Sequence, residues 1–134
     1  MRAMLSIKPE FAEKIFSGEK GFEFRKVAFR RDVTTVVVYV TSPVAKIVGE
    51  FEIAQILEGN PHELWSRTKE KAGISKKFFY EYFKGKTKAI AIEIGKIRQY
   101  PQAKDPYAGG KKFTPPQSFR YLDNLPLLDF LPLS

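Results

Sequence analysis

The sequence predicts an α+β domain, a small mixed β-barrel with short helices inserted between its strands and an extended C-terminal wrap. Segments with strand periodicity alternate with short helical segments over the first part of the chain. Most of the nine prolines lie after residue 97, where the pattern changes character. The length of 134 residues and the hydrophobic share of 43% are typical of one globular domain and exclude a disordered or fibrous chain.

The first predicted helix begins at Pro9 and stops at Gly18. Proline suits a first helical turn because its missing N–H has no intrahelical partner there, and apolar residues recur at helical spacing between the two positions. Residues 21–26 then alternate between apolar and charged side chains, which is the period of a strand. If the two phenylalanines of this strand face the core, Glu23 and Arg25 share the opposite face.

Two longer strands and a capped helix are predicted next. Residues 33–41 are mostly β-branched, as in a strand buried on both faces. Residues 46–57 give another long strand, in which Gly49 indicates a bulge or a close approach of backbone. Asn60 is suited to cap the helix that follows, with Glu63 reaching back in a capping box.

The regular part of the chain ends with one more helix and one more strand. The helix begins near Ser75, carries four aromatic residues at spacings of three and four, and ends at Gly85. Residues 87–97 then form a strongly apolar strand. We therefore expect a barrel domain over residues 1–97 and a proline-rich extension over residues 98–134.

The extension carries too many apolar residues for a solvated tail. We expect it to pack on the barrel or to bury itself in a partner chain. The residues concerned are Phe113, Phe119, Tyr121, Leu122, Leu125, Leu127, Leu128, Phe130, Leu131 and Leu133.

The chain is strongly basic. It holds 23 Lys and Arg against 15 Asp and Glu, a net charge of +8, and its pI is near 9.7. Such a surface favours anionic partners, nucleic acid first, although basic residues also serve solubility alone. The excess is concentrated between Arg67 and Lys88, where eight basic residues face two acidic ones.

Several classes of chemistry are disfavoured by what the sequence holds. Cysteine is absent, which excludes disulfides, thiolate nucleophiles and iron–sulfur ligation. No carboxylate cluster has metal-ligand spacing, so we expect neither a metal nor another cofactor. The single histidine, His62, lies beside the cap of a predicted helix, where a catalytic role is improbable. The run 109–112, Gly-Gly-Lys-Lys, lacks Walker spacing and is interpreted as a basic loop.

A soluble, cytoplasmic protein without membrane contact is expected. The N-terminal residues carry charge at Arg2 and Lys8. The longest uncharged stretch, residues 33–45, is well short of the ~20 apolar residues that a bilayer span needs. The sequence does not predict the oligomeric state.

Polar residues with chemical potential gather around the first helix and the strand that follows it. Lys8 precedes the helix, Lys20 follows it, and Glu23 and Arg25 share one strand face. A lysine beside a carboxylate can act as a desolvated base or as an electrostatic anchor, and an arginine can fork onto phosphate. The alternative is a solvated strand face with one ordinary ion pair.

This segment resembles the signature of the ASCH domain family. The family motif, G-x-K-x-x-E-x-R at the end of the first helix, is matched position for position by Gly18, Lys20, Glu23 and Arg25. The resemblance extends through Tyr-Val-Thr-Ser-Pro and Val-Gly-Glu-Phe to Ile94. It implies a PUA-like pseudo-barrel associated with RNA binding, in which the motif lines a cleft, so that Lys20, Glu23 and Arg25 face a ligand.

The leading hypothesis is an RNA- or nucleotide-binding domain with a basic cleft and a regulatory role in RNA metabolism. The cleft would hold Lys8, Lys20, Glu23, Arg25 and Ser42. The basic segment, with Lys84, Lys86 and Lys88, would extend the phosphate track.

Two alternatives remain open. One is a small hydrolase, either a ribonuclease or an amidohydrolase of acetylated cytidine, with Lys20 as base and Glu23 as its partner. The family's amidohydrolases use a Lys, a Thr and a Glu, and this chain carries Glu23 where they place the nucleophilic threonine. The other alternative is a protein-interaction module with a basic surface.

Overall fold

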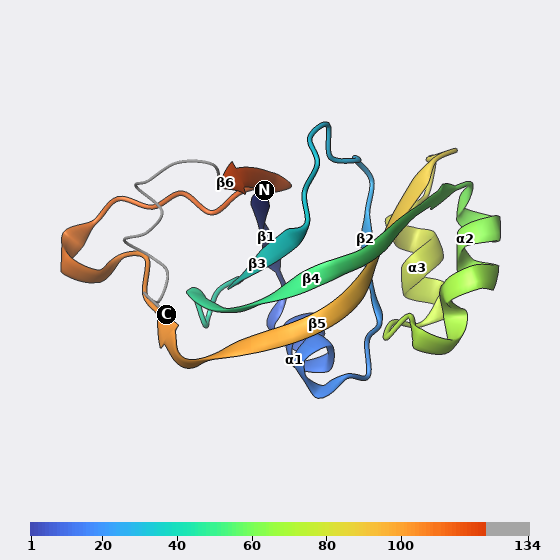
Figure 1. Ribbon diagram of the computed structural model, residues 1–134. Helices are drawn as coiled ribbons and strands as arrows, with labels where there is room; N and C mark the ends of the chain where they lie inside the picture. Colours follow the sequence, from blue (N-terminus) through green and yellow to red (C-terminus); the bar gives the residue numbers. More distant parts are fainter. Residues whose placement is uncertain (123–134) are drawn as a thin grey trace.

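The computed structural model describes residues 1–122 and contains one six-stranded sheet that curls into a half-barrel (Figure 1). The elements in order are β1 (Arg2–Ile7), α1 (Pro9–Ser17), β2 (Phe22–Arg25), β3 (Thr35–Val40), β4 (Lys46–Gly59), α2 (Pro61–Thr68), η1 (Lys69–Lys71), α3 (Lys76–Tyr82), β5 (Ala89–Lys104), η2 (Ala108–Gly110) and β6 (Phe119–Leu122). The sheet order is β2-β5-β4-β3-β1-β6. The predicted α+β class with short inserted helices is confirmed.

Strands β1 and β6 are not predicted by the sequence analysis, and β1 is the one inside the sheet. It pairs in parallel with β3 and antiparallel with β6, so it lies inside the sheet. Its residues Ala3, Met4 and Leu5 are all fully buried. Because both faces of the strand are covered, it shows no apolar–polar alternation, and six residues are too few to stand out as a continuous apolar run.

Three apolar clusters hold the domain together. The first lies between α1 and the concave face of the sheet and contains Leu5, Ile15 and Val38 among others. The second joins α2 and α3 to the ends of β2, β4 and β5, where these helices are grouped in Figure 1. The third lies on the other side of β1, β3, β4 and β5. Alternate residues of β3 enter the first and third clusters, as expected for a strand buried on both faces.

Strand β5 is longer than predicted. It continues to Lys104 rather than ending at residue 97, because β4 remains paired with it as far as Ile47. The register is interrupted between Gly49 and Ile47, and Pro101 lies in this irregular stretch, where a missing N–H is tolerated. Gly49 itself shows the predicted close approach of backbone, since a Cβ there would lie 2.6 Å from the Arg98 carbonyl oxygen and 2.8 Å from the Phe16 ring.

The described part of the extension returns to the sheet. Strand β6 pairs with β1 at the edge opposite β2, and Phe119 and Tyr121 pack on Phe29 of the β2–β3 loop. The apolar residues after position 122 lie outside the described residues; they are Leu125, Leu127, Leu128, Phe130, Leu131 and Leu133. The division at residue 97 stays a prediction, and β5 runs across it.

Candidate functional site

A pocket of about 170 Å³ lies where the end of β1, α1, β2 and the helical insertion meet. Lys8, Lys20, Glu23 and Arg25, four of the predicted site residues, line it together. Aromatic rings from α1, β2 and α3 supply much of the remaining wall. The turn at Gly18 and the two-residue period of β2 therefore bring the motif residues to one place, as the sequence suggested.

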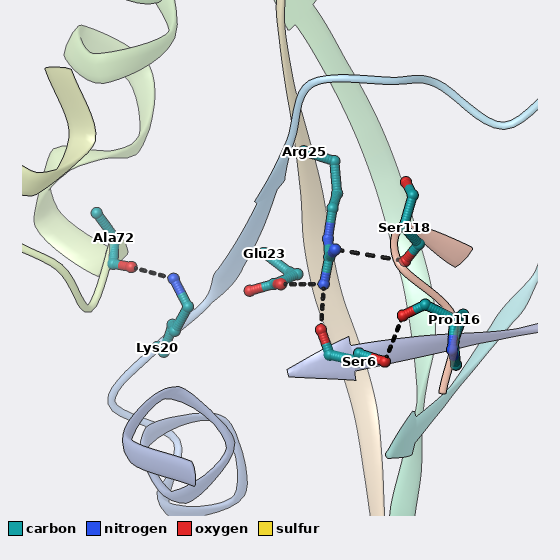
Figure 2. Close-up of polar contacts among 7 residues, drawn as sticks. All are labelled: Ser6, Lys20, Glu23, Arg25, Ala72, Pro116 and Ser118. Carbon is teal, nitrogen blue, oxygen red and sulfur yellow. Dashed lines mark hydrogen bonds and ion pairs between the residues drawn. The ribbon is translucent and has the colours of Figure 1, made fainter. Parts of the chain in front are cut away.

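The turn after α1 directs Lys20 into the protein. Gly18 adopts a left-handed conformation at φ 87°, and its N–H donates to the Ile15 carbonyl, which ends the helix. The Lys20 N–H then donates to the Lys14 carbonyl at 3.0 Å. The Lys20 side chain is only 2% exposed, and its Nζ donates to the Ala72 carbonyl at 2.8 Å (Figure 2).

The helical insertion closes over this lysine through its backbone. Gly73 has φ +69°, and a Cβ added there would lie 2.6 Å from both Cβ and Cγ of Lys20. The Lys14 ammonium donates to the Gly73 carbonyl at 3.2 Å, and the Gly21 N–H donates to the Lys71 carbonyl at 2.8 Å. The absence of a side chain at residue 73 thus lets the insertion seal one side of the pocket.

The buried ammonium has an unusual environment. It lies 4.8 Å from the Phe24 ring centroid and 5.5 Å from that of Phe11. Burial lowers the pKa of Lys20 to about 8; the negative charge of Glu23 opposes this shift, and the positive charge of Lys14 reinforces it. At pH 7, roughly one molecule in ten therefore carries Lys20 as a neutral amine.

Glu23 and Arg25 form a buried ion pair. Arg25 Nη2 donates to Glu23 Oε2 at 2.8 Å, and the two side chains are 13% and 8% exposed. The same nitrogen donates to the Ser6 carbonyl at 3.0 Å, and Nη1 donates to the Ser118 carbonyl at 3.4 Å (Figure 2). Arg25 Nε is buried and has no hydrogen-bond partner among residues 1–122.

These contacts make Arg25 a bridge across the open side of the half-barrel. It lies on β2, one edge of the sheet, and reaches β1 and the segment that leads into β6 at the other edge. The Ser6 hydroxyl donates to the Pro116 carbonyl at 2.7 Å and fastens the same segment. Most donors of the guanidinium are thus committed to protein acceptors, whereas the sequence suggested a fork onto phosphate. The carboxylate of Glu23 is in turn held in place.

The remaining predicted site residues lie apart from this pocket. Ser42 is exposed in the turn after β3 and does not line it. Lys84, Lys86 and Lys88 are exposed in the connection between α3 and β5, and Lys88 Nζ lies 3.5 Å from a Glu58 carboxylate oxygen. His62 is exposed on α2.

Sequence reasoning did not single out two aromatic residues of this site. Phe78 and Tyr82 were interpreted as part of an apolar helix face, yet both line the pocket and are half-buried. The number of aromatic residues in this helix could have indicated their role in the site. Of the rings on and directly after α3, only Phe79 and Phe83 are buried in the apolar cluster behind the helix, so the other rings exceed what one buried face needs.

Two features are absent from residues 1–122. Within residues 1–122, no three His, Cys, Asp or Glu side chains are grouped so that they could hold a metal ion. None of the helices in that range is long and apolar enough to cross a membrane.

Known proteins resemble this chain over most of its length. The ASCH domain pattern matches residues 5–100. A protein of Zymomonas mobilis named ASCH domain-containing ribonuclease is 34% identical over 126 residues, which cover 90% of this chain and 83% of the relative. Two proteins of Ureaplasma parvum match at 36% and 37% identity, named ATP synthase subunit alpha and large ribosomal subunit protein uL22. The chain spans only 15% and 33% of the length of these two.

Solved structures share the fold. A crystal structure of a Tyr-to-Phe variant of the Zymomonas mobilis ASCH protein superimposes with a TM-score of 0.81 at 29% identity, covering 90% of this chain and 89% of that one. Another structure of the same protein gives a TM-score of 0.77 at 30% identity, with 90% and 87% covered. The curled sheet with its inserted helices is therefore the fold seen in these crystal structures.

Proposed function

Because the chain belongs to the ASCH domain family, we propose that it binds single-stranded RNA and holds one nucleotide in the pocket around Lys20 and Glu23. The observation that carries the proposal is a buried lysine and a buried carboxylate that line one pocket among aromatic rings. The net charge of +8 supplies the long-range attraction to an RNA backbone.

The pocket offers the contacts that an unpaired base requires. The Lys20 ammonium is a donor, and Glu23 keeps Oε1 as an acceptor while Arg25 holds Oε2. A donor beside an acceptor complements the polar edge of a base, whose flat faces can contact the surrounding rings. Exposed Lys8 at the same pocket suits a phosphate. A base in a duplex cannot enter such a pocket, which is why we favour single strands.

Fluorescence anisotropy with a labelled single-stranded RNA tests this function. We expect binding that weakens steeply as salt rises, and much weaker binding of a duplex with the same sequence. Lys20→Met should lose at least tenfold in affinity because it removes the ammonium donor from the pocket, while the Arg25–Glu23 ion pair remains. Lys96→Gln removes an exposed charge on β5 and serves as control. Equal affinity for single strand and duplex, or no effect of Lys20→Met, would overturn the proposal.

A second candidate function, ribonuclease, rests on two observations. A relative that matches over most of both chains is named a ribonuclease, and the pKa of Lys20 lies at about 8. In this hypothesis the neutral Lys20 amine takes the proton of a ribose 2′-hydroxyl, whose oxygen attacks the adjacent phosphorus. The bond from phosphorus to the 5′ oxygen breaks, and that oxygen takes a proton from water. The products are a 2′,3′-cyclic phosphate and a 5′-hydroxyl.

Cleavage can be separated from binding by one comparison. Lys20→Arg keeps the charge but cannot act as a base. If the chain is a ribonuclease, wild type should cleave single-stranded RNA, and a 2′-deoxy nucleotide at the cleaved position should stop the reaction. Cleavage that persists in Lys20→Arg would exclude Lys20 as the base. The hypothesis of a protein-interaction module predicts no RNA binding at all.

A further inference from the structure

We propose that Phe78, Tyr82, Lys8 and Lys26 form a second RNA contact along the α3 wall of the pocket, a platform on which a neighbouring base stacks while its flanking phosphates meet the two ammonium groups. This inference rests on the proposed function, since it assumes that the ligand is single-stranded RNA. None of the four residues belongs to the family motif, and Phe78, Tyr82 and Lys26 have no role in the sequence analysis. We call these four residues the stacking platform.

The two rings are aligned. Phe78 and Tyr82 lie one turn apart on α3, with ring centroids 6.5 Å apart and an angle of 9° between the ring planes. Phe11 packs edge-on against Phe78 at 5.3 Å, and Phe83 packs edge-on against Tyr82 at 4.8 Å. These neighbours fix the orientation of both rings, so the platform exists before a ligand arrives.

Each ring carries one lysine. Lys8 Nζ lies 5.8 Å from the Phe78 centroid, and Lys26 Nζ lies 4.5 Å from the Tyr82 centroid. The two lysines come from different segments, directly before α1 and directly after β2, and both are exposed. Neither ammonium pairs with a carboxylate within the described residues 1–122. The ring faces are their contacts in the free protein.

This arrangement matches what single-stranded nucleic acid requires. Such strands are bound by aromatic side chains on which bases stack, combined with cations that track the backbone. A base that stacks on either ring displaces the lysine from the ring face, and the lysine can then reach the phosphate beside that base. The contact that is lost, between a lysine and a ring at an exposed site, is weak. Two stronger contacts replace it, the stack of the base on the ring and the contact of the lysine with phosphate.

The charge of the surface favours RNA over an apolar peptide. Covering Lys8 and Lys26 with an apolar segment would desolvate two ammonium groups without giving them an anion. The basic connection with Lys84, Lys86 and Lys88 is a different kind of surface. Within residues 1–122 none of its lysines lies over an aromatic ring, and Lys88 Nζ lies 3.5 Å from a Glu58 carboxylate oxygen.

Ring-to-aliphatic variants test the stacking. Phe78→Leu and Tyr82→Leu keep apolar bulk but remove the flat face, and each should weaken binding of a labelled single-stranded RNA about tenfold. Tyr82→Phe keeps the ring and should retain the affinity of the wild type. Tyr80→Leu, on the same helix but outside the pocket, is the matched control. Near-ultraviolet circular dichroism checks that every variant is folded.

Two further measurements test the phosphate contacts of the lysines and the position of the stacked base. Lys8→Gln and Lys26→Gln should each flatten the log–log dependence of affinity on salt by about 0.7, while Lys96→Gln should not. An RNA with one abasic nucleotide placed in turn along the strand should bind wild type more weakly at one position next to the pocket nucleotide. At that position, Tyr82→Leu should bind the abasic and intact strands equally.

The outcomes separate the two proposals. If wild type binds single-stranded RNA and Lys20→Met weakens it, but Phe78→Leu and Tyr82→Leu bind like Tyr80→Leu, the stacking platform is wrong and the pocket proposal stands. If wild type does not bind single-stranded RNA at low salt, both proposals fail. Binding of an apolar peptide at the platform in place of RNA would also overturn it.

Discussion

Burial has opposite consequences in two parts of this molecule. In the pocket, burial lowers the pKa of Lys20 to about 8, toward neutral pH. In the third apolar cluster, burial raises the pKa of Tyr39 to about 12, and it raises the pKa of Tyr100, which donates to Glu50 at 2.8 Å. Desolvation always opposes the charged form, so it makes a lysine easier to deprotonate and a tyrosine harder. The same physical effect therefore makes the first region chemically responsive and the second inert.

The two regions also differ in where their contacts come from. Lys20 donates to a backbone carbonyl of the helical insertion, and Arg25 donates to carbonyls of β1 and of the segment before β6. Arg25 also holds the Glu23 carboxylate, and all three residues line a pocket. Tyr100 is held by the side chain of Glu50 on the neighbouring strand. A pocket built from distant segments should be more sensitive to single changes than a contact inside one sheet.

The largest expected effect is on the ion pair of the pocket. Arg25→Ala leaves the Glu23 carboxylate buried without its partner, and it removes the bridge to Ser6 and Ser118. We expect it to lower the free energy of unfolding by about 3–5 kcal/mol, measured by urea denaturation. Adding Glu23→Gln should restore part of this loss because no lone charge remains buried. If Arg25→Ala does not fold, Arg25→Lys should give a smaller loss. If Arg25→Ala or Arg25→Lys unfolded at the same urea concentration as wild type, Arg25 would not stabilise the protein by linking β2 to Ser6 and Ser118.

A second prediction concerns pH. The pKa of Lys20 is about 8 in the folded protein and 10.5 in the unfolded chain. Between these values the unfolded chain binds the proton and the folded protein does not, so stability rises with pH in this window. Between pH 7 and 9.5 the gain should be about 2 kcal/mol. Lys20→Met should lack it.

The third apolar cluster, which contains Tyr39 and Tyr100 and is called the tyrosine cluster below, should make stability fall rather than rise at higher pH. Because the pKa of Tyr39 and that of Tyr100 are raised above the ordinary value of 10, stability falls as pH rises beyond that value. Urea denaturation of wild type and Lys20→Met across this pH range measures both trends. Curves for the two proteins that run parallel from pH 7 to 9.5 would show that Lys20 is not desolvated.

A third prediction isolates the backbone contact on Lys20. Gly73→Ala combines a left-handed backbone with a Cβ placed 2.6 Å from Lys20 atoms, whereas Gly85→Ala has the same backbone requirement at φ +79° and open space around it. Gly73→Ala should therefore be about 1–2 kcal/mol more destabilising than Gly85→Ala. It should also weaken RNA binding. Equal losses in thermal unfolding would mean that the insertion moves aside freely.

The smallest expected effect is in the tyrosine cluster. Tyr100→Phe removes one hydrogen bond to Glu50, whose side chain is 18% exposed and keeps Arg98 Nη1 at 3.9 Å. We expect a loss of about 1 kcal/mol in thermal unfolding and no change in RNA affinity. A larger loss than that of Arg25→Ala would reverse the comparison between the two regions.

Much of the fold and part of the site could be predicted from the sequence. Hydrophobic periodicity and the prolines and glycines at element ends located α1, β2 and β3, and a glycine within a strand indicated the close approach at Gly49. These features depend on neighbours within a few residues. The same local rules put Glu23 and Arg25 on one face and turned Lys20 toward them. The family motif then indicated that this face lines a cleft, and the pocket confirms that these residues meet.

Only the tertiary structure decided what surrounds them. Lys20 bonds Ala72 across 52 residues, and Arg25 reaches Ser118 across 93, so neither partner is visible in any local pattern. Strand β1 escaped detection because both of its faces are covered by distant segments, which leaves six residues without apolar–polar alternation. Periodicity fixes the side of an element on which a residue lies. Whether that side meets solvent, a ring or a carbonyl depends on how the half-barrel closes. Here the insertion and the segment leading into β6 bury a face that the two-residue period alone would also allow to be solvated.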